Sequence, residues 1–226
     1  MNCLQENQKT KLIASLFIIL IIGTLTILAY TSENATMGEA VRTGMKSTVG
    51  VMATQITPAD IAGLKPGDEN TAQYQAVARK LQTMRSMDDQ ILNAYILNVN
   101  ADGTITFLVD DLYPDDPQGS AKIGEVSTAP DRVAILEALS LPTTSKEPYT
   151  TKYGSFMTAY APIDDAAHDS GGNTYAILAI DMSAQKYHDY TSRGGFIILT
   201  GLISMVLAVG GIFYFGRQRR ENEKDQ

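Results

Sequence analysis

Two long stretches without a charged residue lie near the two ends of this 226-residue chain. They cover residues 12–30 and 196–215 and are 19 and 20 residues long. Because a helix rises about 1.5 Å per residue, each stretch can cross a hydrocarbon core of about 30 Å. A cleaved signal peptide is the alternative for the first stretch, but its apolar run is long for one and no small-residue cleavage site follows before Tyr30. The chain is therefore predicted to cross a membrane twice.

The charges around these stretches predict their orientation. Lys9 and Lys11 precede the first stretch, and the tail GRQRRENEKDQ follows the second. The segment between them, 31–195, carries 12 basic and 21 acidic residues. Because short basic flanks remain in the cytoplasm, both termini are expected to be cytoplasmic and 31–195 to lie outside the plasma membrane. An acidic exterior also argues against nucleic acid as a partner.

The expected organisation is a cytoplasmic N-terminus (1–11), a transmembrane helix (12–30), an extracytoplasmic domain (31–195), a second transmembrane helix (196–215) and a cytoplasmic tail (216–226). The only cysteine is Cys3, so no disulfide can form within the chain and a hydrophobic core must stabilise the outer domain. The tail is too short for a catalytic module. We therefore expect the output to come from a separate partner, unless the chain is a truncated or split receptor.

The first part of the outer segment is predicted to be helical. Apolar and small residues recur at three- and four-residue spacing across 33–56, which is typical of an amphipathic helix. This helix is expected to end at Thr57-Pro58, because the residue before a proline is pushed out of helical conformation. Further helices are expected over 71–87, 131–139 and 183–193.

A hairpin is predicted over 94–110, with its turn at Asn100–Gly103. In its second arm Ile105, Phe107 and Val109 alternate with their neighbours, so we expect them to share the buried face of a strand.

Two more strands are expected over 154–163, ending at a proline, and over 174–180. The second is an almost unbroken apolar run, which predicts a central strand buried on both faces. Helices that precede a mostly antiparallel sheet place the fold in the α+β class.

Four sequence pieces resemble, in their order, the extracytoplasmic PAS-like sensor domain called Cache or PDC. They are AYILNVNADGTITFLVDD, AKIGE, YGSFMTAYAPI and YAILAIDMSAQKY, in which Asp110, Gly124, Tyr160-Ala161-Pro162 and Ile180-Asp181 match the family pattern. The resemblance covers roughly 33–190. It implies an antiparallel sheet of about five strands, a long N-terminal helix through which such domains dimerise, and a ligand pocket between the sheet and its covering loops. Receptors of this family normally continue into a HAMP segment and a kinase, cyclase or chemotaxis module, which this sequence lacks.

The candidate pocket residues are aromatic or polar side chains on the predicted inner sheet face and its covering loop: Tyr95, Phe107, Asp110, Lys122, Tyr153, Phe156, Tyr160 and Asp181. An aromatic wall with a few convergent polar groups is typical of a small-molecule site. The alternative is that the aromatic residues are core and that Asp181 caps the helix after it, and for Asp181 we favour the cap. The amine-recognition pattern of some Cache receptors is not evident, so the ligand class stays open.

Catalysis and cofactors are not expected. Neither histidine, His168 or His188, stands in a recognisable nucleophile motif, and no phosphate-loop, zinc or kinase motif occurs. Two acidic loops could bind calcium or magnesium: one contains Asp110, Asp111, Asp115 and Asp116, the other Asp164, Asp165, His168 and Asp169. Neither has the spacing of a calcium-binding loop, and a solvated turn is the preferred interpretation of both.

In the second apolar stretch four small residues fall on one helix face, namely Gly201, Ser204, Ala208 and Gly211. Small residues let helices approach closely in lipid, so this face predicts a helix–helix contact within the chain or in a homodimer.

The leading hypothesis is a membrane-anchored sensor that binds a small solute outside the membrane and relays the signal to a separate kinase or chemotaxis-type partner. One alternative is an interaction or structural module without a ligand, which docks a receptor or envelope partner. The other is a sensor of divalent cations.

Overall fold

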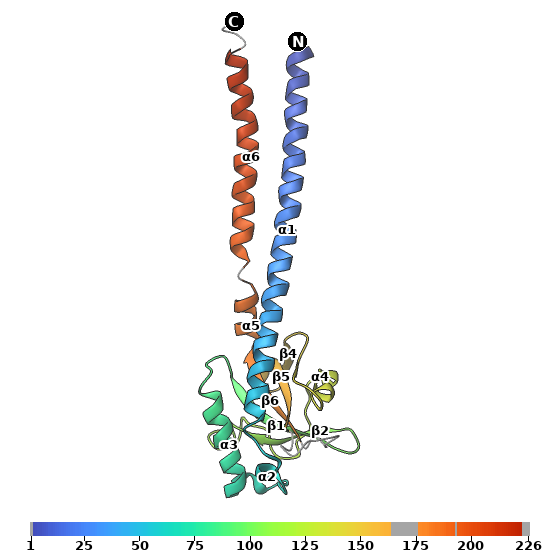
Figure 1. Cartoon of the computed structure of the whole chain (residues 1–226), viewed down its shortest axis with the longest axis vertical. Coiled ribbons are helices and arrows are strands. Elements are labelled where there is room, and N and C mark those ends of the chain that lie inside the picture. Colours follow the sequence, from blue (N-terminus) through green and yellow to red (C-terminus); the bar gives the residue numbers. More distant parts are fainter. Residues whose placement is uncertain (1, 164–175, 193, 223–226) are drawn as a thin grey trace. The chain divides into compact units, whose positions relative to one another are not determined.

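The computed structural model describes residues 2–163, 176–192 and 194–222. The chain divides into two compact units, one made of Met1–Met37 with Thr191–Gln226 and the other of Gly38–Tyr190. The second unit contains the β-sheet (Figure 1).

The first unit consists of the N-terminal part of helix α1 (Asn2–Ala53) and of helix α6 (Gly195–Asn222). Both belong to helical segments, Lys9–Ala53 and Ala184–Arg217, that are long and apolar enough to cross a membrane. Their apolar side chains are largely exposed, as Leu20 (67%) and Val206 (72%) illustrate. Such exposure is costly in water and natural in lipid, so the two helices are consistent with membrane anchoring.

The second unit is built on one antiparallel sheet. Its strand order is β2 (Ile105–Asp110), β1 (Asn93–Val99), β6 (Ala176–Ser183), β5 (Gly154–Ile163) and β3 (Thr143–Thr144), while β4 (Tyr149–Thr151) also pairs with β5. The middle strand is β6, and every one of its residues except Ser183 is buried. This confirms the predicted central strand and the α+β, PAS-like fold.

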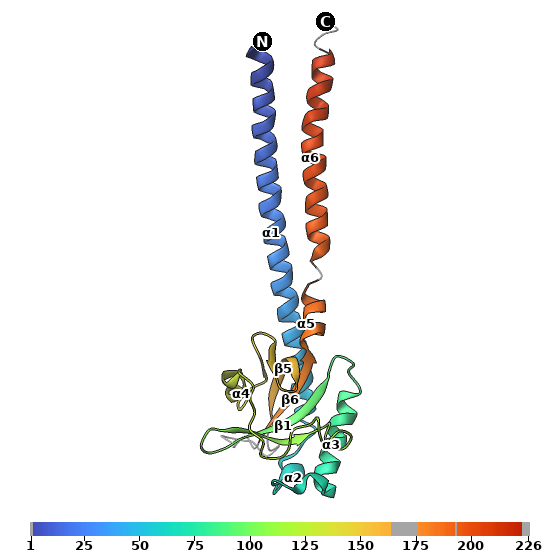
Figure 2. The ribbon, with the colours of Figure 1, turned by 180° about the vertical axis from the view of Figure 1, so that it is seen from behind.

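Helices cover one face of this sheet. The outer part of α1 and helix α3 (Ala72–Arg85) pack Val49 and Leu81 against sheet residues such as Ile96 and Leu178 (Figure 1). The loop 111–127 and the short helix α4 (Arg132–Glu137) cover the opposite face, where Leu97, Ile177 and Ala179 form a second apolar cluster. Figure 2 shows the sheet with α1 behind it.

Helix α1 ends at Ala53, three residues before the predicted end at Ile56. The physical reason is that Thr57 starts the next helix, α2 (Pro58–Ile61). Its side chain accepts a hydrogen bond from Asp60 N (3.3 Å), and Asp60 Oδ2 accepts one from Thr57 N (2.9 Å). This reciprocal capping satisfies two backbone donors that the helix start would otherwise leave unpaired.

The remaining short elements were only partly foreseen. The 3₁₀ helix η1 (Asp68–Asn70) and helix α5 (Ala184–Thr191) occupy polar segments, the latter as predicted. Strands β3 and β4 were not predicted, because they are only two and three residues long and are defined by backbone pairing with β5.

The predicted alternation of β2 is wrong at Val109. The pairing of β1 with β2 shifts between Ile96 and Leu97, so that Leu108 is an extra residue, a β-bulge. Phe107 faces the loop-covered side of the sheet, whereas Leu108 and Val109 both pack with the helices on the other side. The bulge thereby returns Asp110 to the same face as Phe107.

Candidate functional site

A cavity of about 170 Å³ lies between the loop-covered face of the sheet and the covering loop. Six of the eight predicted pocket residues line it: Tyr95, Phe107, Asp110, Tyr153, Phe156 and Asp181. They come from four separate strands and one turn, so the sheet is what brings them together.

Two predicted residues lie elsewhere. Tyr160 is fully buried behind the pocket wall, and its hydroxyl is 2.9 Å from that of Tyr149, which lines the cavity. Lys122 is exposed and borders a neighbouring surface hollow with Lys152. The prediction grouped Lys122 with the pocket because of its place in the loop, but its side chain lies on the solvent side of that loop.

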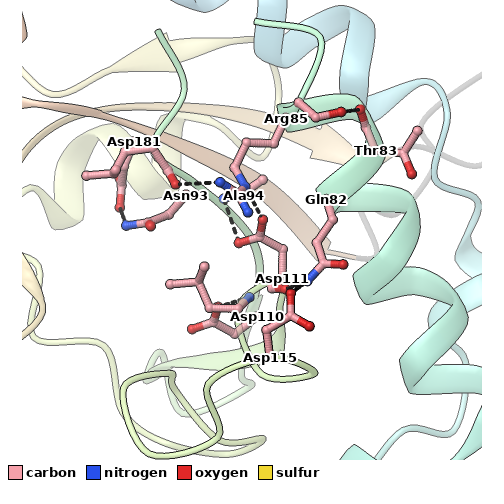
Figure 3. Close-up of polar contacts among 12 residues, drawn as sticks. Gln82, Thr83, Arg85, Asn93, Ala94, Asp110, Asp111, Asp115 and Asp181 are labelled. Carbon is pink, nitrogen blue, oxygen red and sulfur yellow. Dashed lines mark hydrogen bonds and ion pairs between the residues drawn. The ribbon is translucent and has the colours of Figure 1, made fainter. Parts of the chain in front are cut away.

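Asp181 is the most deeply buried acid of the pocket, with 3% of the residue exposed. Its Oδ1 accepts hydrogen bonds from Thr158 Oγ1 (2.7 Å) and Tyr95 Oη (3.2 Å). Its Oδ2 accepts one from Asn93 Nδ2 (3.3 Å), and Figure 3 shows Asp181 beside Asn93. Burial raises the pKa of Asp181 to about 7 although these three donors oppose the shift.

The interpretation of Asp181 as a helix cap is wrong. Asp181 lies inside β6 and pairs with Asn93 and Thr158 of the neighbouring strands. The side chain that bonds to the first turn of α5 is that of Ser183, which accepts from Lys186 N at 3.2 Å. The strand runs three residues further than its apolar pattern indicated.

Asp110 is the second buried acid of the pocket. Its Oδ2 accepts from Ala121 N (2.8 Å) and its Oδ1 from Leu112 N (2.9 Å), so the carboxylate also fastens the covering loop to the end of β2. Burial raises the pKa of Asp110 to about 6 against the effect of these two backbone donors. The charge of Asp110 in turn adds to the raised pKa of Asp181.

The next residue, Asp111, has a different role. It is fully buried and binds Arg85 Nε (2.5 Å) and Ala94 N (3.1 Å), while Gln82 Nε2 donates to its carbonyl oxygen (2.6 Å). Figure 3 shows this cluster, in which α3 is attached to the sheet. Asp111 is therefore structural, and its charge is already paired.

A chain of hydrogen bonds runs from Asp181 through the wall of the pocket. Thr158 Oγ1 donates to Asp181, Tyr149 Oη lies 2.7 Å from Thr158 Oγ1 and 2.9 Å from Tyr160 Oη, and Tyr160 donates to Asp131 Oδ2 at 2.8 Å. These four contacts share three hydroxyl protons. When both end carboxylates are ionised, one contact therefore lacks a proton, and the chain has an excess of acceptors.

Asn93, Tyr149, Thr158 and Asp131 were missed by the sequence prediction. The period of two in β5 places Thr158 on the same face as Phe156 and Tyr160, so Thr158 could have been found. Tyr149 and Asp131 lie in segments whose position depends on the sheet, and no local signal marks them.

Aromatic rings form much of the pocket wall. The rings of Tyr95 and Phe107 have centroids 5.3 Å apart, and Tyr153 meets Phe107 edge to face at 6.1 Å. The Tyr153 hydroxyl is held by Glu125. These contacts fix the rings, and a fixed wall reduces the ordering cost of binding.

A larger hollow of about 310 Å³ is lined mainly by apolar and small residues of α1 and by Ile91, Ile180 and Met182, and Asp88 and Asp181 also border it, but neither Asp110 nor the aromatic rings of the smaller cavity do. We prefer the smaller cavity as the site because both buried, incompletely neutralised acids of the sheet face, Asp110 and Asp181, converge there with aromatic rings.

For metal binding the structure offers no support within the residues that it describes. Among 2–163, 176–192 and 194–222, no group of three or more His, Cys, Asp or Glu side chains is placed to hold an ion. The predicted loop with Asp164, Asp165, His168 and Asp169 lies outside the described residues.

The small residues predicted on one face of α6 differ in their surroundings. Gly201 is buried against Thr26 of α1, where a side chain would clash. Ser204 is exposed and bonds to Thr200 O at 2.8 Å, while Ala208 and Gly211 are half-buried. Only Gly201 makes a close helix–helix contact within one chain, and packing by the other three stays a prediction.

No protein-family model and no curated protein sequence matches the chain. Among solved structures, it is similar to the periplasmic domain of RsbU from Chlamydia trachomatis (10% identity, TM-score 0.41, 74% of this chain and 56% of that chain). It is also similar to the sensor domain of the V. cholerae histidine kinase DctB (13%, 0.40, 85% and 60%). A third is the periplasmic sensory domain of the Campylobacter jejuni chemoreceptor Tlp1 (11%, 0.34, 75% and 62%).

The DctB structure is a sensor domain of a histidine kinase, and the Tlp1 structure is a sensory domain of a chemoreceptor. The chain spans about 56–63% of the length of the first three chains that it matches. At 10–13% identity the likeness concerns the fold alone.

Proposed function

We propose that this chain is a two-pass membrane sensor whose outer domain, 31–195, binds a small solute in the cavity of the sheet. Both termini are cytoplasmic in this proposal, and the signal passes to a separate partner such as a kinase or a chemotaxis-type transducer. The observation that carries it is the convergence of Asp110, Asp181 and the aromatic rings on one cavity.

The order of the chain supports a relay. Asp181 lies on β6, which is followed by α5 and then by the apolar helix α6. A solute bound at β6 therefore contacts the strand that leads into a membrane span. Binding changes the output only if the solute prefers one arrangement of the spans, because a ligand shifts an equilibrium by its differential affinity.

The test is a screen of small metabolites against the full chain in lipid nanodiscs, read out as the melting temperature. A ligand at about 100 times its dissociation constant adds roughly 2.7 kcal/mol to the stability of the folded state. We expect at least one compound to raise the melting temperature saturably, with one molecule bound per chain.

A folded chain that no compound of a broad library stabilises contradicts the proposal. If such a chain instead purifies with a stoichiometric receptor or envelope protein, the interaction module is the better account.

A further inference from the structure

We infer that the solute selected by this cavity is a small organic cation with N–H donors, such as a primary ammonium ion. This inference rests on the proposed function and adds the chemical class of the ligand. Four features of the pocket carry it: its charges, its hydrogen-bonding balance, its aromatic wall and its size.

The charges of the lining are all negative. Asp110 and Asp181 line the cavity, and no Lys, Arg or His is among the described residues that line it. Arg85 pairs with Asp111, and Lys152 pairs with Glu125 (2.9 Å) and lies over the Tyr153 ring, 4.8 Å from its centroid, while the exposed Lys122 borders a separate hollow. A carboxylate ligand would thus enter a poorly solvated site with two like charges and without a cation to balance them.

The hydrogen-bonding groups at the pocket also favour a donor ligand, because they include more acceptors than available protons. The chain from Asp181 through Thr158, Tyr149 and Tyr160 to Asp131 contains one proton fewer than its contacts can use. Of this chain, Asp181 and Tyr149 line the cavity. A ligand that donates a hydrogen bond to Asp181 reduces the shortage, whereas one that only accepts hydrogen bonds adds a further acceptor.

The aromatic wall favours positive charge. Tyr95, Phe107, Tyr149, Tyr153 and Phe156 all line the cavity. The face of an aromatic ring carries partial negative charge and attracts ammonium groups, more strongly where water is excluded. The same rings also cover the alkyl part of such a ligand.

The size of the cavity limits the ligand. A volume of about 170 Å³ is close to that of an engineered apolar cavity of roughly 150 Å³ that holds benzene. The part of the ligand that lies inside the cavity is therefore expected to have on the order of five to eight non-hydrogen atoms.

The experiment uses matched probes on the full chain in nanodiscs, with empty nanodiscs as the blank. Methylammonium to butylammonium ions, the carboxylates of equal length and the corresponding alcohols are titrated by calorimetry. We expect butylammonium to bind about tenfold or more tightly than butanol, and butyrate to give no detectable binding.

Two variants test whether the ligand interacts with the charge of Asp181. Asp181→Asn keeps the size of the side chain and removes its charge, and we expect it to weaken butylammonium binding about tenfold or more. Asp89→Asn is the matched control, because the Asp89 side chain is 93% exposed and outside the cavity. It should change the affinity less than about twofold.

Binding of butyrate or butanol at least as tight as that of butylammonium overturns the ligand class and leaves the proposed sensor intact. The inference also fails if no alkylammonium ion binds, or if the Asp181→Asn variant binds butylammonium as the wild type does. Failure of the proposed function itself is distinct, since it requires that no compound of the broad library stabilises the chain.

Discussion

Asp181 and Asp110 are the residues on which the site depends. A buried carboxylate is destabilising unless donors or a counter-charge compensate for lost hydration. Here the donors are neutral, namely hydroxyl, amide and backbone N–H groups, and burial outweighs them in both cases. The protein therefore retains two groups that would ionise more readily in water than in the folded state.

This predicts a pH dependence that Asp181→Asn removes. The pKa of Asp181 rises from its ordinary 3.8 to about 7, so between these pH values the folded state holds more protons than the unfolded state. The free energy of unfolding then falls as the pH rises from about 4 to about 7, by roughly 4 kcal/mol for a shift of this size. Above about pH 7 the variant should be the more stable protein.

Melting temperatures of wild type, Asp181→Asn and Asp89→Asn between pH 4 and 8 check this prediction. Asp89→Asn should follow the wild type, because its exposed charge loses little hydration on folding. If the melting temperatures of the wild type and Asp181→Asn changed in parallel with pH, burial would not raise the pKa of Asp181.

The bulge at Leu108 shows what residue patterns can and cannot predict about an element. Alternation correctly indicated a strand over Ile105–Asp110, but a regular strand would put Phe107 and Asp110 on opposite faces. The extra residue changes the parity and brings both into the pocket. Such a bulge depends on pairing with β1, which the sequence of β2 alone does not encode.

Elements with a strong local signal were predicted well. The apolar run of β6 indicated the central strand, and Thr71 caps α3 by accepting from Tyr74 N, close to the expected start of that helix. Strands β3 and β4 were missed because only their partner β5 defines them. Tyr149, a member of the polar chain in the pocket wall, was missed with β4.

A substitution of Gly154 tests the backbone conformation at the start of β5. Its φ is +141°, and a Cβ there would lie 2.6 Å from Cζ of Phe156, a residue that lines the pocket. We expect Gly154→Ala to destabilise the fold by more than about 1 kcal/mol and to displace the Phe156 ring, which weakens ligand binding.

The matched control is Gly44→Ala in α1, where no atom lies within 4 Å of the added carbon. In a helix this change should stabilise by up to about 1 kcal/mol. Melting temperatures distinguish the two, and a Gly154→Ala variant as stable as the wild type would contradict the account of this turn.

For the whole molecule, the two charge-free stretches lie in the long helices α1 and α6, and the unit that contains the sheet is Gly38–Tyr190. The position of the pocket could not be read from hydropathy, because it depends on the pairing of strands that are up to 88 residues apart, as Asn93 and Asp181 are.

The proposed orientation can be tested with thiol chemistry, since Cys3 is the only cysteine. A membrane-impermeant maleimide should label the wild type only after cells are permeabilised. A Cys3→Ser chain carrying Asp89→Cys should be labelled in intact cells, because the side chain at position 89 is exposed on the outer domain. Labelling of the wild type in intact cells, with the Asp89→Cys chain labelled only after permeabilisation, would contradict the proposed orientation.

The central claim is that the cavity beside Asp181 is the solute site, and filling the cavity tests it most directly. Ala129 lines the cavity, so Ala129→Phe occupies the space of a ligand, whereas Ala101→Phe adds the same ring in an exposed turn. Calorimetric titration of the full chain with a stabilising compound should show one molecule bound per chain for the wild type and Ala101→Phe. Ala129→Phe should bind none. Unchanged binding by a folded Ala129→Phe variant would contradict the claim.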